Sequence, residues 1–285
     1  MQLADTVVTR PALWLLGHGV AASPSPAMQN AALRARGLDW EYAIRDVSAA
    51  QLPDALRALR DGVARGANVT IPHKRAVAEA CDELAGDALP TGAVNTVTVG
   101  EGGRLVGDNT DALGLEGALR AQGLWPEPGA VAVVLGAGGA AAAAILALSR
   151  AGASTISLVA RRPDAAGGMQ GMPVTRVVRW SPDAVSDTLS RAGRAGSILV
   201  NATPAPLVDL PVDVAALPDD CIVIDLRYRP RPVDLVAAAR ARGLRAADGL
   251  EMLLHQGMLS FHRWTGLEPP WDAARQALRD AVAAP

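Results

Sequence analysis

The chain has 285 residues, enough for two modest domains or one large domain. Half of its residues are hydrophobic, a fifth are charged and the formal net charge is −2. This balance is ordinary for a soluble globular protein and argues against nucleic acid or a membrane as a partner.

The cysteines and histidines form no redox or metal-binding motif. Cys81 and Cys221 lie far apart, and the N-terminal residues lack the basic and apolar segments of a signal peptide. Both features favour a reducing, cytoplasmic location. No histidine stands close enough in sequence to another for a ligand pair, so no metal site is predicted. The histidines are His18, His73, His255 and His262.

The first predicted strand covers residues 13–17 and leads to a serine- and proline-containing turn. Ser25 before Pro26 is typical of an N-cap and N1 pair, and the helix should end at Gly37. Ser23 and Ser25 thus place two hydroxyls at a helix N-terminus, where an anion can be held. For Ser25, capping alone is the alternative.

The pattern of strand and helix then repeats, which indicates an α/β region. Strands are predicted at 40–44 and 66–71, with a helix at about 49–61 between them. Pro72 is expected to open the next helix. The apolar face of that helix should carry Val77, Cys81 and Leu84.

Three basic residues, His73, Lys74 and Arg75, fall in the first turn of that helix. Cations at a helix N-terminus oppose the macrodipole, so helix stability does not explain them. A basic cluster after a strand indicates an acidic or electron-rich ligand, with tolerated surface cations as the alternative.

A hairpin is predicted from strands at 92–99 and 104–108. A helix at 112–121 follows, for which Asp111 is either the N-cap or a site residue. Polar residues near strand ends are candidates for a ligand site, because α/β sheets place ligands there. These residues are Asn68, Lys74, Asn95 and Asp111.

The segment 131–150 predicts a buried strand, a glycine turn and a helix, with another strand at 155–159. This is the context in which a G-x-G-x-x-[GA] motif indicates dinucleotide binding. Gly136 allows the tight turn, Gly138 lets the backbone approach a pyrophosphate, and the helix N-terminus favours phosphate. A βα unit without a ligand and a membrane span are the alternatives.

The end of the strand at 155–159 indicates which dinucleotide is bound. An NAD site favours an acidic residue there, but Arg161 and Arg162 follow instead. Because arginine can bind a 2′-phosphate bidentately, NADP(H) is the predicted cofactor. A solvated arginine pair is the alternative.

The rest of the chain contains two more predicted strands and two helices. After Arg162 the chain is expected to be irregular. The strands are 197–201 and 221–226, and the helices are 233–242 and a final one from Gly249 to Gly266.

Taken in order, these motifs resemble those of the shikimate dehydrogenase family from Gly17 to Gly266. Each motif alone is weak, whereas the ordered set is specific. The matching stretches are Ser23-Pro-Ser-Pro26 with Asn30, Asn68-Val-Thr-Ile-Pro-His-Lys74, Gly92-Ala-Val-Asn-Thr-Val97, Asn109-Thr-Asp111, Gly136-Ala-Gly-Gly139, Asn201-Ala-Thr203, Asp225 to Tyr228, and Gly249-Leu-Glu-Met252 with Gln256.

The resemblance implies reversible, NADP-dependent reduction of 3-dehydroshikimate to shikimate, a step of aromatic amino acid biosynthesis. It makes Lys74 and Asp111 the catalytic pair. It assigns substrate binding to Ser23, Ser25, Thr70, Asn95, Tyr228 and Gln256. It assigns cofactor binding to Gly136, Gly138, Gly139, Ala140, Arg161, Arg162, Thr203 and Gly249.

Several positions depart from the family's pattern. Ala22 and Gln29 stand where histidine is usual, and Pro206 stands where glycine is usual. These changes motivate one alternative, a family member acting on quinate or an aminoshikimate-type analogue. A second alternative, from another class, is an NADP(H)-binding regulatory protein without catalysis.

The expected fold is two α/β domains with the cofactor and substrate meeting in the cleft between them. Residues 1–111 and 249–285 should form the substrate-binding domain, and residues 112–248 the Rossmann-type NADP-binding domain. The expected partner is a small-molecule substrate, and the protein should be a monomer or homodimer.

Overall fold

The computed structural model describes residues 12–161 and 171–283. By their internal contacts they divide into two compact units, and each described unit contains a six-stranded sheet. The first unit comprises residues 1–88, 93–108 and 257–285, and the second comprises residues 89–92 and 109–256. The α/β class expected from the sequence is confirmed.

The sheet of the first unit is mixed, in the order β2-β1-β3-β5-β6-β4. Strand β5 runs antiparallel to both of its neighbours, β3 and β6, and the other pairs are parallel. The elements are β1 (Ala12–Gly17), α1 (Ser25–Ala35), β2 (Glu41–Asp46), α2 (Leu52–Arg60), β3 (Gly66–Val69), α3 (Lys74–Ala80), β4 (Glu83–Leu84), α4 (Ala88–Thr91, mostly in the second unit), β5 (Thr96–Val99), β6 (Leu105–Asp108), part of α9 (Leu250–Thr265) and α10 (Trp271–Ala283).

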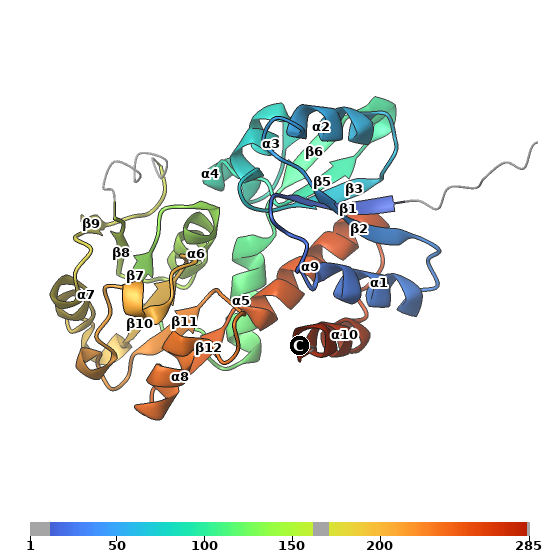
Figure 1. The fold of residues 1–285 in the computed structure, drawn as a ribbon. Coiled ribbons are helices and arrows are strands. Elements are labelled where there is room, and N and C mark those ends of the chain that lie inside the picture. The colour runs from blue at the N-terminus through green and yellow to red at the C-terminus, as the bar shows by residue number, and fades with distance from the viewer. Residues whose placement is uncertain (1–11, 162–170, 284–285) are drawn as a thin grey trace, which may run out of the picture. The chain divides into compact units, whose positions relative to one another are not determined.

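Helices cover both faces of this sheet. Helices α2 and α3 cover one face, and α1, α10 and the C-terminal part of α9 lie on the other (Figure 1). Because side chains alternate along a strand, Trp14 and Leu16 of β1 join Leu56 and Val77 in the α2–α3 core. Gly66 allows α9 to approach closely, since a Cβ there would lie 2.5 Å from Trp264 Nε1.

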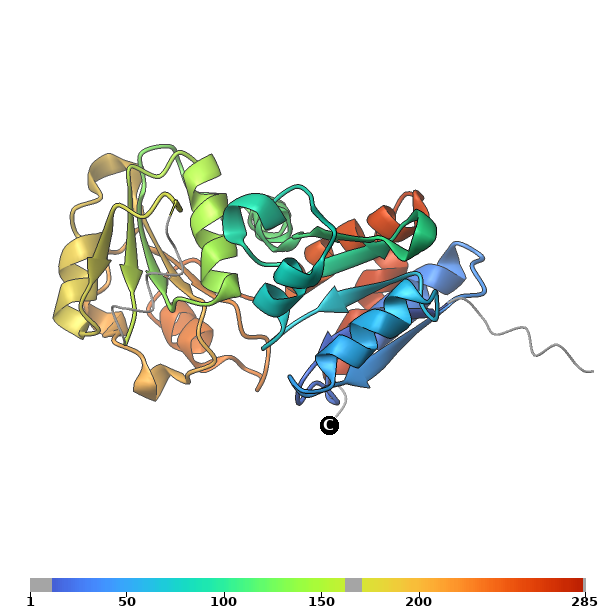
Figure 2. The ribbon, with the colours of Figure 1, turned by 90° about the horizontal axis from the view of Figure 1, so that it is seen from above.

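The sheet of the second unit is entirely parallel, in the order β12-β11-β10-β7-β8-β9. Figure 2 shows α6 on one side of it and α7 on the other. The elements are α5 (Asp111–Ala121), β7 (Val131–Leu135), α6 (Gly139–Arg150), β8 (Thr155–Val159), β9 (Arg176–Val178), α7 (Pro182–Leu189), β10 (Ser197–Asn201), β11 (Ile222–Asp225), α8 (Asp234–Ala241), β12 (Ala246–Asp248) and the N-terminal part of α9.

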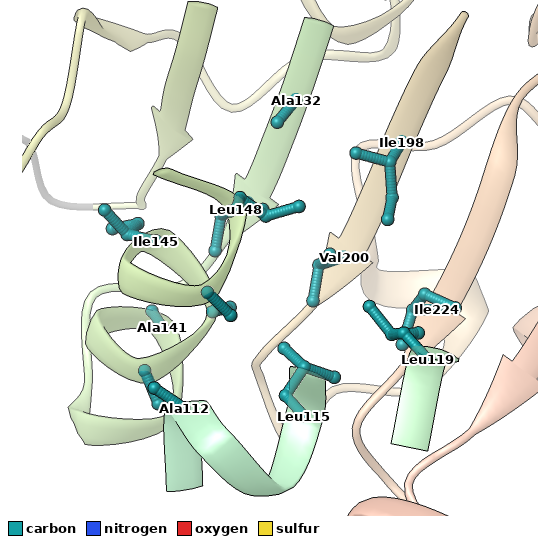
Figure 3. Close-up of a cluster of buried hydrophobic side chains, with 14 of the residues drawn as sticks. Ala112, Leu115, Leu119, Ala132, Ala141, Ile145, Leu148, Ile198, Val200 and Ile224 are labelled. Atoms are coloured by element: carbon teal, nitrogen blue, oxygen red, sulfur yellow. The ribbon is translucent and has the colours of Figure 1, made fainter. Parts of the chain in front are cut away.

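The core between α5, α6 and this sheet is built from alanine and branched aliphatic residues (Figure 3). Leu115 of α5 lies beside Val200 of β10, and Leu119 of α5 lies beside Ile224 of β11 (Figure 3). The run Ala141–Ala144 is fully buried, so the small side chains let α6 pack closely on the sheet.

The apolar run around residues 131–150 is therefore a strand and a separate helix rather than a membrane span. Within residues 12–161 and 171–283, no helix is long and apolar enough to cross a membrane.

The structure corrects the helix predicted to begin at Pro72. Helix α3 begins at Lys74 and ends at Ala80, so Cys81 and Leu84 do not continue its face. Leu84 belongs instead to β4, which pairs with β6. The physical reason is Asp82, whose carboxylate accepts hydrogen bonds from the Leu105 N–H and from Arg60 and so draws the chain into an extended path.

Two further predictions were wrong in detail. The segment after Arg162, expected to be irregular, contains β9 and α7, while Arg162 itself lies outside the described residues. Helix α1 begins at Ser25 with Pro24 at the N-cap, so Ser25 is not the cap. Helix α10 was not predicted from the sequence, although its apolar residues recur at a regular helical spacing on one face.

Candidate functional site

In the first unit, the predicted polar residues gather at one edge of the sheet. The carboxyl ends of β1, β2, β3 and β6 lie at this edge, and the reversed direction of β5 brings its amino end there as well. The edge therefore receives Asn95, which precedes β5, as well as Thr70, which follows β3.

The loop that carries Ser23 is held by Asp46 at the end of β2. The Asp46 carboxylate accepts hydrogen bonds from the backbone N–H groups of Gly19 at 3.1 Å and Val20 at 3.2 Å, and from His18 Nδ1 at 3.2 Å. The hydrogen bond from Gly19 is the main reason that the pKa of Asp46 is lowered.

The two serine hydroxyls of the substrate motif lie together. Ser23 Oγ donates to Ser25 Oγ at 3.2 Å and accepts a hydrogen bond from the Ser25 N–H. Ser25 is buried at the first position of α1. This placement agrees with two hydroxyls at a helix N-terminus, where an anion is favoured.

Lys74 is fixed through its neighbours in the chain. His73 is buried and its Nε2 donates to the Val47 carbonyl at 2.7 Å, which ties the start of α3 to the end of β2. The Thr70 carbonyl accepts from the His73 N–H, and the Lys74 carbonyl accepts from Val94 N–H at 2.9 Å. Lys74 itself is half-buried, and the hydrogen bond from Val94 joins its backbone to the residue that precedes Asn95.

Asn95 is a buried amide held by three strands. Its carbonyl accepts from the Val69 N–H of β3, and its own N–H donates to the Asp108 carbonyl of β6. Its side-chain Oδ1 accepts from the Thr96 hydroxyl at 2.8 Å. Backbone hydrogen bonds thus link the segments of Thr70, Lys74 and Asn95 at this edge of the first unit, and the Ser23–Ser25 pair follows β1, whose carboxyl end lies at the same edge.

In the second unit, Asp111 and Gln256 lie in neighbouring segments. Asp111 is buried as the first residue of α5, and Thr110 is the N-cap, so Asp111 is not the cap. Its N–H donates to Asn109 Oδ1, and the Thr110 hydroxyl donates to the Gln256 carbonyl at 3.0 Å. A Cβ at Gly114 would lie 2.6 Å from that of Gln256, which shows how closely α5 and α9 pack.

The glycine turn at the end of β7 has the backbone that its motif predicts. Gly136 has φ of 107°, a conformation that favours glycine. A Cβ there would also lie 2.9 Å from Thr203 Cγ2, so the structure brings Gly136 and Thr203 together. Gly138 is the N-cap of α6, and Gly139 and Ala140 are its first residues.

These residues fit a phosphate-bearing dinucleotide. A Cβ at Gly138 would meet no described atom within 4 Å, which leaves open space at the start of a twelve-residue helix. Asn201, fully buried at the end of β10, has a side-chain Nδ2 with no hydrogen-bond partner within the described residues. Arg161 follows β8 with its guanidinium carbon 5.0 Å from the Trp180 ring centroid.

Tyr228 and Gly249 lie in segments that are fixed against each other. A Cβ at Gly249 would lie 2.0 Å from the Leu226 carbonyl oxygen, and the Gly249 N–H donates to the Arg227 carbonyl. Arg227 is held by the carboxylates of Asp225 and Asp234. Tyr228 is half-buried, and burial raises the pKa of its phenol.

Sequence reasoning missed three residues that organise the first unit. Asp46 could have been found by its place at the end of a strand, at the edge where other polar residues were expected. Ser260 lies on the buried face of α9 between Met258 and Phe261, where a hydroxyl needs a partner. Tyr42, in β2, gave no comparable signal.

Among the described residues, no group of three or more His, Cys, Asp and Glu side chains is arranged to hold a metal ion.

Comparisons with known proteins agree with these motifs. The family profile "Shikimate dehydrogenase substrate binding domain" matches residues 15–97, and "Shikimate 5'-dehydrogenase C-terminal domain" matches residues 249–279. The shikimate dehydrogenase (NADP(+)) of Methylobacterium radiotolerans is 39% identical, over 97% of this chain and 98% of that protein.

Solved structures are similar over the same range. Shikimate 5-dehydrogenase from Thermus thermophilus, in complex with NADP(H) and shikimate, has a TM-score of 0.82 and 37% identity, covering 95% of this chain and 99% of that one. Quinate dehydrogenase from Corynebacterium glutamicum, in complex with NAD, has a TM-score of 0.83 and 30% identity, covering 95% and 99%. On this likeness across nearly its whole length, the chain belongs to the shikimate dehydrogenase family.

Proposed function

We propose that this protein is an NADP-dependent shikimate dehydrogenase that interconverts 3-dehydroshikimate and shikimate. The observation that carries the proposal is the edge of the first sheet where strand ends supply polar residues: the paired hydroxyls of Ser23 and Ser25 after β1, Thr70 after β3, and Lys74 and Asn95, whose segments are joined by backbone hydrogen bonds. Family membership and the NADP(H)- and shikimate-bound relative support the same activity.

Substrate recognition follows from the groups at this edge. The serine hydroxyls at the start of α1 suit a carboxylate, because the helix N-terminus favours negative charge. Thr70 and Asn95 offer further polar groups for ring hydroxyls, and we assign Gln256 and Tyr228 of the second unit to the same substrate. A polyhydroxylated acid needs many such partners, since each buried polar group left unpaired costs about 1–3 kcal/mol.

Lys74 and Asp111 are the proposed catalytic pair. When bound, the nicotinamide of NADP(H) exchanges a hydride with the carbon that bears the reacting oxygen. During reduction that oxygen gains negative charge and requires a proton, which the Lys74 ammonium group donates. The buried carboxylate of Asp111 orients the ammonium group and balances its charge. In oxidation Lys74 takes the proton back.

Cofactor binding is assigned to the second unit. The N–H groups at the start of α6, beyond Gly136, Gly138 and Gly139, would hold the pyrophosphate, with Ala140, Thr203 and Gly249 lining the site. Arg161 would bind the 2′-phosphate, together with Arg162, and the Trp180 ring supports the Arg161 guanidinium. We propose that residues 1–111 with 249–285 form the substrate-binding domain and residues 112–248 the cofactor-binding domain, with two exceptions: Tyr228, assigned to the substrate, and Gly249, assigned to the cofactor.

The direct test is oxidation of shikimate by NADP⁺, followed by the absorbance of the reduced nicotinamide. We expect turnover that requires both compounds. Tight NADPH binding without turnover on any substrate would support a regulatory NADP(H)-binding protein instead. We propose that the protein is a monomer or a homodimer, and light scattering on the same preparation will distinguish the two.

Quinate is the second candidate substrate, because a quinate dehydrogenase is also a structural relative. In addition, the loop that carries Ser23 (the serine loop) has Ala22 where the family usually has histidine. Gln29, the second position at which the family usually has histidine, is fully buried and its Nε2 donates to the Gly257 carbonyl at 2.8 Å, so it fixes α1 to α9. Comparing kcat/KM for shikimate, quinate and an aminoshikimate-type analogue will decide the preference. We expect shikimate to be the best of the three.

A further inference from the structure

A buried polar network in the first unit ends at the proposed substrate ligand Asn95. Its members come from β2, β3, α9 and the start of β5, and none is more than 6% exposed. The network consists of Tyr42, Asn68, Ser260, Thr96 and Asn95. The proton transfers described above do not use the first four of these residues.

The chemistry of the groups fixes the direction of the bonds nearest Asn95. The Asn95 Oδ1 atom is an amide oxygen and can only accept, so its 2.8 Å contact with Thr96 Oγ1 uses the Thr96 hydroxyl proton. Thr96 Oγ1 also lies 2.8 Å from Ser260 Oγ. Because Thr96 has already used its proton, Ser260 is the donor in that second bond.

The same reasoning assigns the donor and acceptor of each remaining hydrogen bond, as far as Tyr42. Asn68 Nδ2 donates to Ser260 Oγ at 2.9 Å and to the Asn95 carbonyl at 3.1 Å, with a longer contact of 3.4 Å to Thr96 Oγ1. Asn68 Oδ1 must then accept, and the Tyr42 hydroxyl donates to it at 2.8 Å. Burial raises the pKa of Tyr42, so its phenol keeps the proton that it donates.

Tyr42 is itself held in place by the substrate motif's helix. The side-chain amide of Asn30 in α1 donates to the Tyr42 carbonyl at 2.9 Å and accepts from the Tyr42 N–H at 2.8 Å. The Tyr42 ring also packs against Trp264, with ring centroids 6.2 Å apart. The donor that begins the network is therefore anchored on both its backbone and its ring.

We propose that this network sets the orientation of the Asn95 amide, so that Asn95 presents N–H donors to a hydroxyl oxygen of the substrate. The inference rests on the proposed function, in which Asn95 binds shikimate. Rotating the amide by 180° would turn the Asn95 oxygen away from the Thr96 hydroxyl and place the NH₂ group against Thr96 Oγ1, which already lies 3.4 Å from the Asn68 Nδ2 donor. Asn68 cannot turn over to relieve this crowding of donors, because its Nδ2 donates to the Asn95 carbonyl, which can only accept, and its Oδ1 accepts from the Tyr42 hydroxyl. Thr96, Ser260 and Tyr42 are thus positioning residues for substrate specificity.

The first test is Thr96→Val, which keeps the side-chain shape and removes the hydroxyl. We expect KM for shikimate to rise about tenfold, the change that corresponds to about 1.4 kcal/mol, with kcat within about twofold and KM for NADP⁺ unchanged. Thr96→Ser should restore the wild-type KM. Thr98→Val is the matched control, because it makes the same chemical change two residues along β5, outside the network.

Two further variants extend the test along the network. Tyr42→Phe and Ser260→Ala should also raise KM for shikimate, by smaller factors, and Tyr42→Phe serves if Thr96→Val does not fold. Equal KM values for wild type and all three variants, or the same KM change in Thr98→Val, would overturn the inference. A loss of kcat with unchanged KM would also overturn it.

A set of monodeoxy shikimate analogues identifies the bonded hydroxyl. For one analogue, Thr96→Val and wild type should bind equally well, because the hydroxyl that Asn95 recognises is missing. Calorimetry measures these affinities without turnover. Absence of wild-type turnover would therefore count against the proposed function alone, whereas a uniform penalty across all analogues would count against the orientation of Asn95.

Discussion

The two sheets offer their ligands different kinds of group. In the second unit, the parallel sheet places a glycine turn and a helix N-terminus after β7, so the proposed phosphate ligands are backbone N–H groups. In the first unit, the reversed strand β5 adds side chains from its amino end to an edge formed by strand carboxyl ends. The backbone N–H groups of the second unit thus suit the phosphates of a dinucleotide. The side chains of the first unit suit a ring with several distinct hydroxyls.

The interiors differ in the same way. The face of the second sheet under α5 and α6 is lined by alanine, leucine, isoleucine and valine (Figure 3). The face of the first sheet under α9 instead carries Asn68 and Thr96, which are joined by hydrogen bonds to Ser260 of α9. Apolar packing tolerates changes that preserve volume, whereas a buried polar network fails when one partner is removed. The following variants compare the two units, by the activity of their sites and by the stability of their folds.

The largest effect is expected for Lys74→Ala at the edge of the first unit. Loss of the proton donor should lower kcat by about 10²–10⁴-fold while shikimate still binds. Steady-state kinetics and calorimetry on the same protein measure both quantities. Arg75→Ala, the exposed neighbour in α3, is the control and should keep near-normal kcat. Near-normal rates in Lys74→Ala would show that the catalytic assignment is wrong.

The second effect is one of stability in the second unit. Leu115 is 1% exposed and lies in the core that α5 shares with the sheet. Leu115→Ala should lower the free energy of unfolding by about 2–5 kcal/mol, because it leaves a cavity. Leu113→Ala, on the same helix but 37% exposed, should cost much less. Denaturant unfolding of the two variants gives the comparison, and equal losses would contradict this account of the core.

The third effect concerns cofactor choice. Arg161→Ala should raise KM for NADP⁺ by about tenfold to a hundredfold, since a hydrogen bond to a charged group contributes about 1.5–3 kcal/mol. KM for NAD⁺ should change little, because NAD⁺ lacks the 2′-phosphate. Arg179→Ala, an exposed arginine next to Trp180, is the matched control. Parallel kinetics with both cofactors would contradict the assignment if both KM values rose together.

The two units also differ in how much their sequences predicted. The strand, turn and helix of residues 131–150 were predicted closely, because a buried parallel strand and an alanine-rich helix have strong local signals. Helix α3 was placed two residues early and extended past Ala80, because the bonds that end it come from Arg60 and Leu105 elsewhere in the chain. Long-range hydrogen bonds leave no periodic signal in the sequence.

The same distinction holds for the site. The motif residues Ser23, Lys74 and Asn95 were recognisable by type and position, and the structure places all three at one edge of the first unit. The residues that hold them were not recognisable, because Asp46 and Ser260 act through partners that are distant in sequence. Sequence motifs indicate which groups contact a ligand, whereas tertiary structure is needed to show what orients those groups.

The smallest effect is expected at Asp46, whose carboxylate holds the serine loop. Its pKa lies below the ordinary value of 3.8, chiefly because of the hydrogen bond from Gly19. A lowered pKa means that the carboxylate stabilises the folded protein above pH 3.8, and that this contribution is lost as the pH falls through the lowered pKa. Asp46→Asn should therefore lower the Tm slightly at neutral pH, and the difference from wild type should shrink below pH 3.8. Asp54→Asn, an exposed acid in α2 paired with Arg57, is the control. A Tm difference between Asp46→Asn and wild type that stayed constant across this range would show that the loop does not depend on the charge of Asp46.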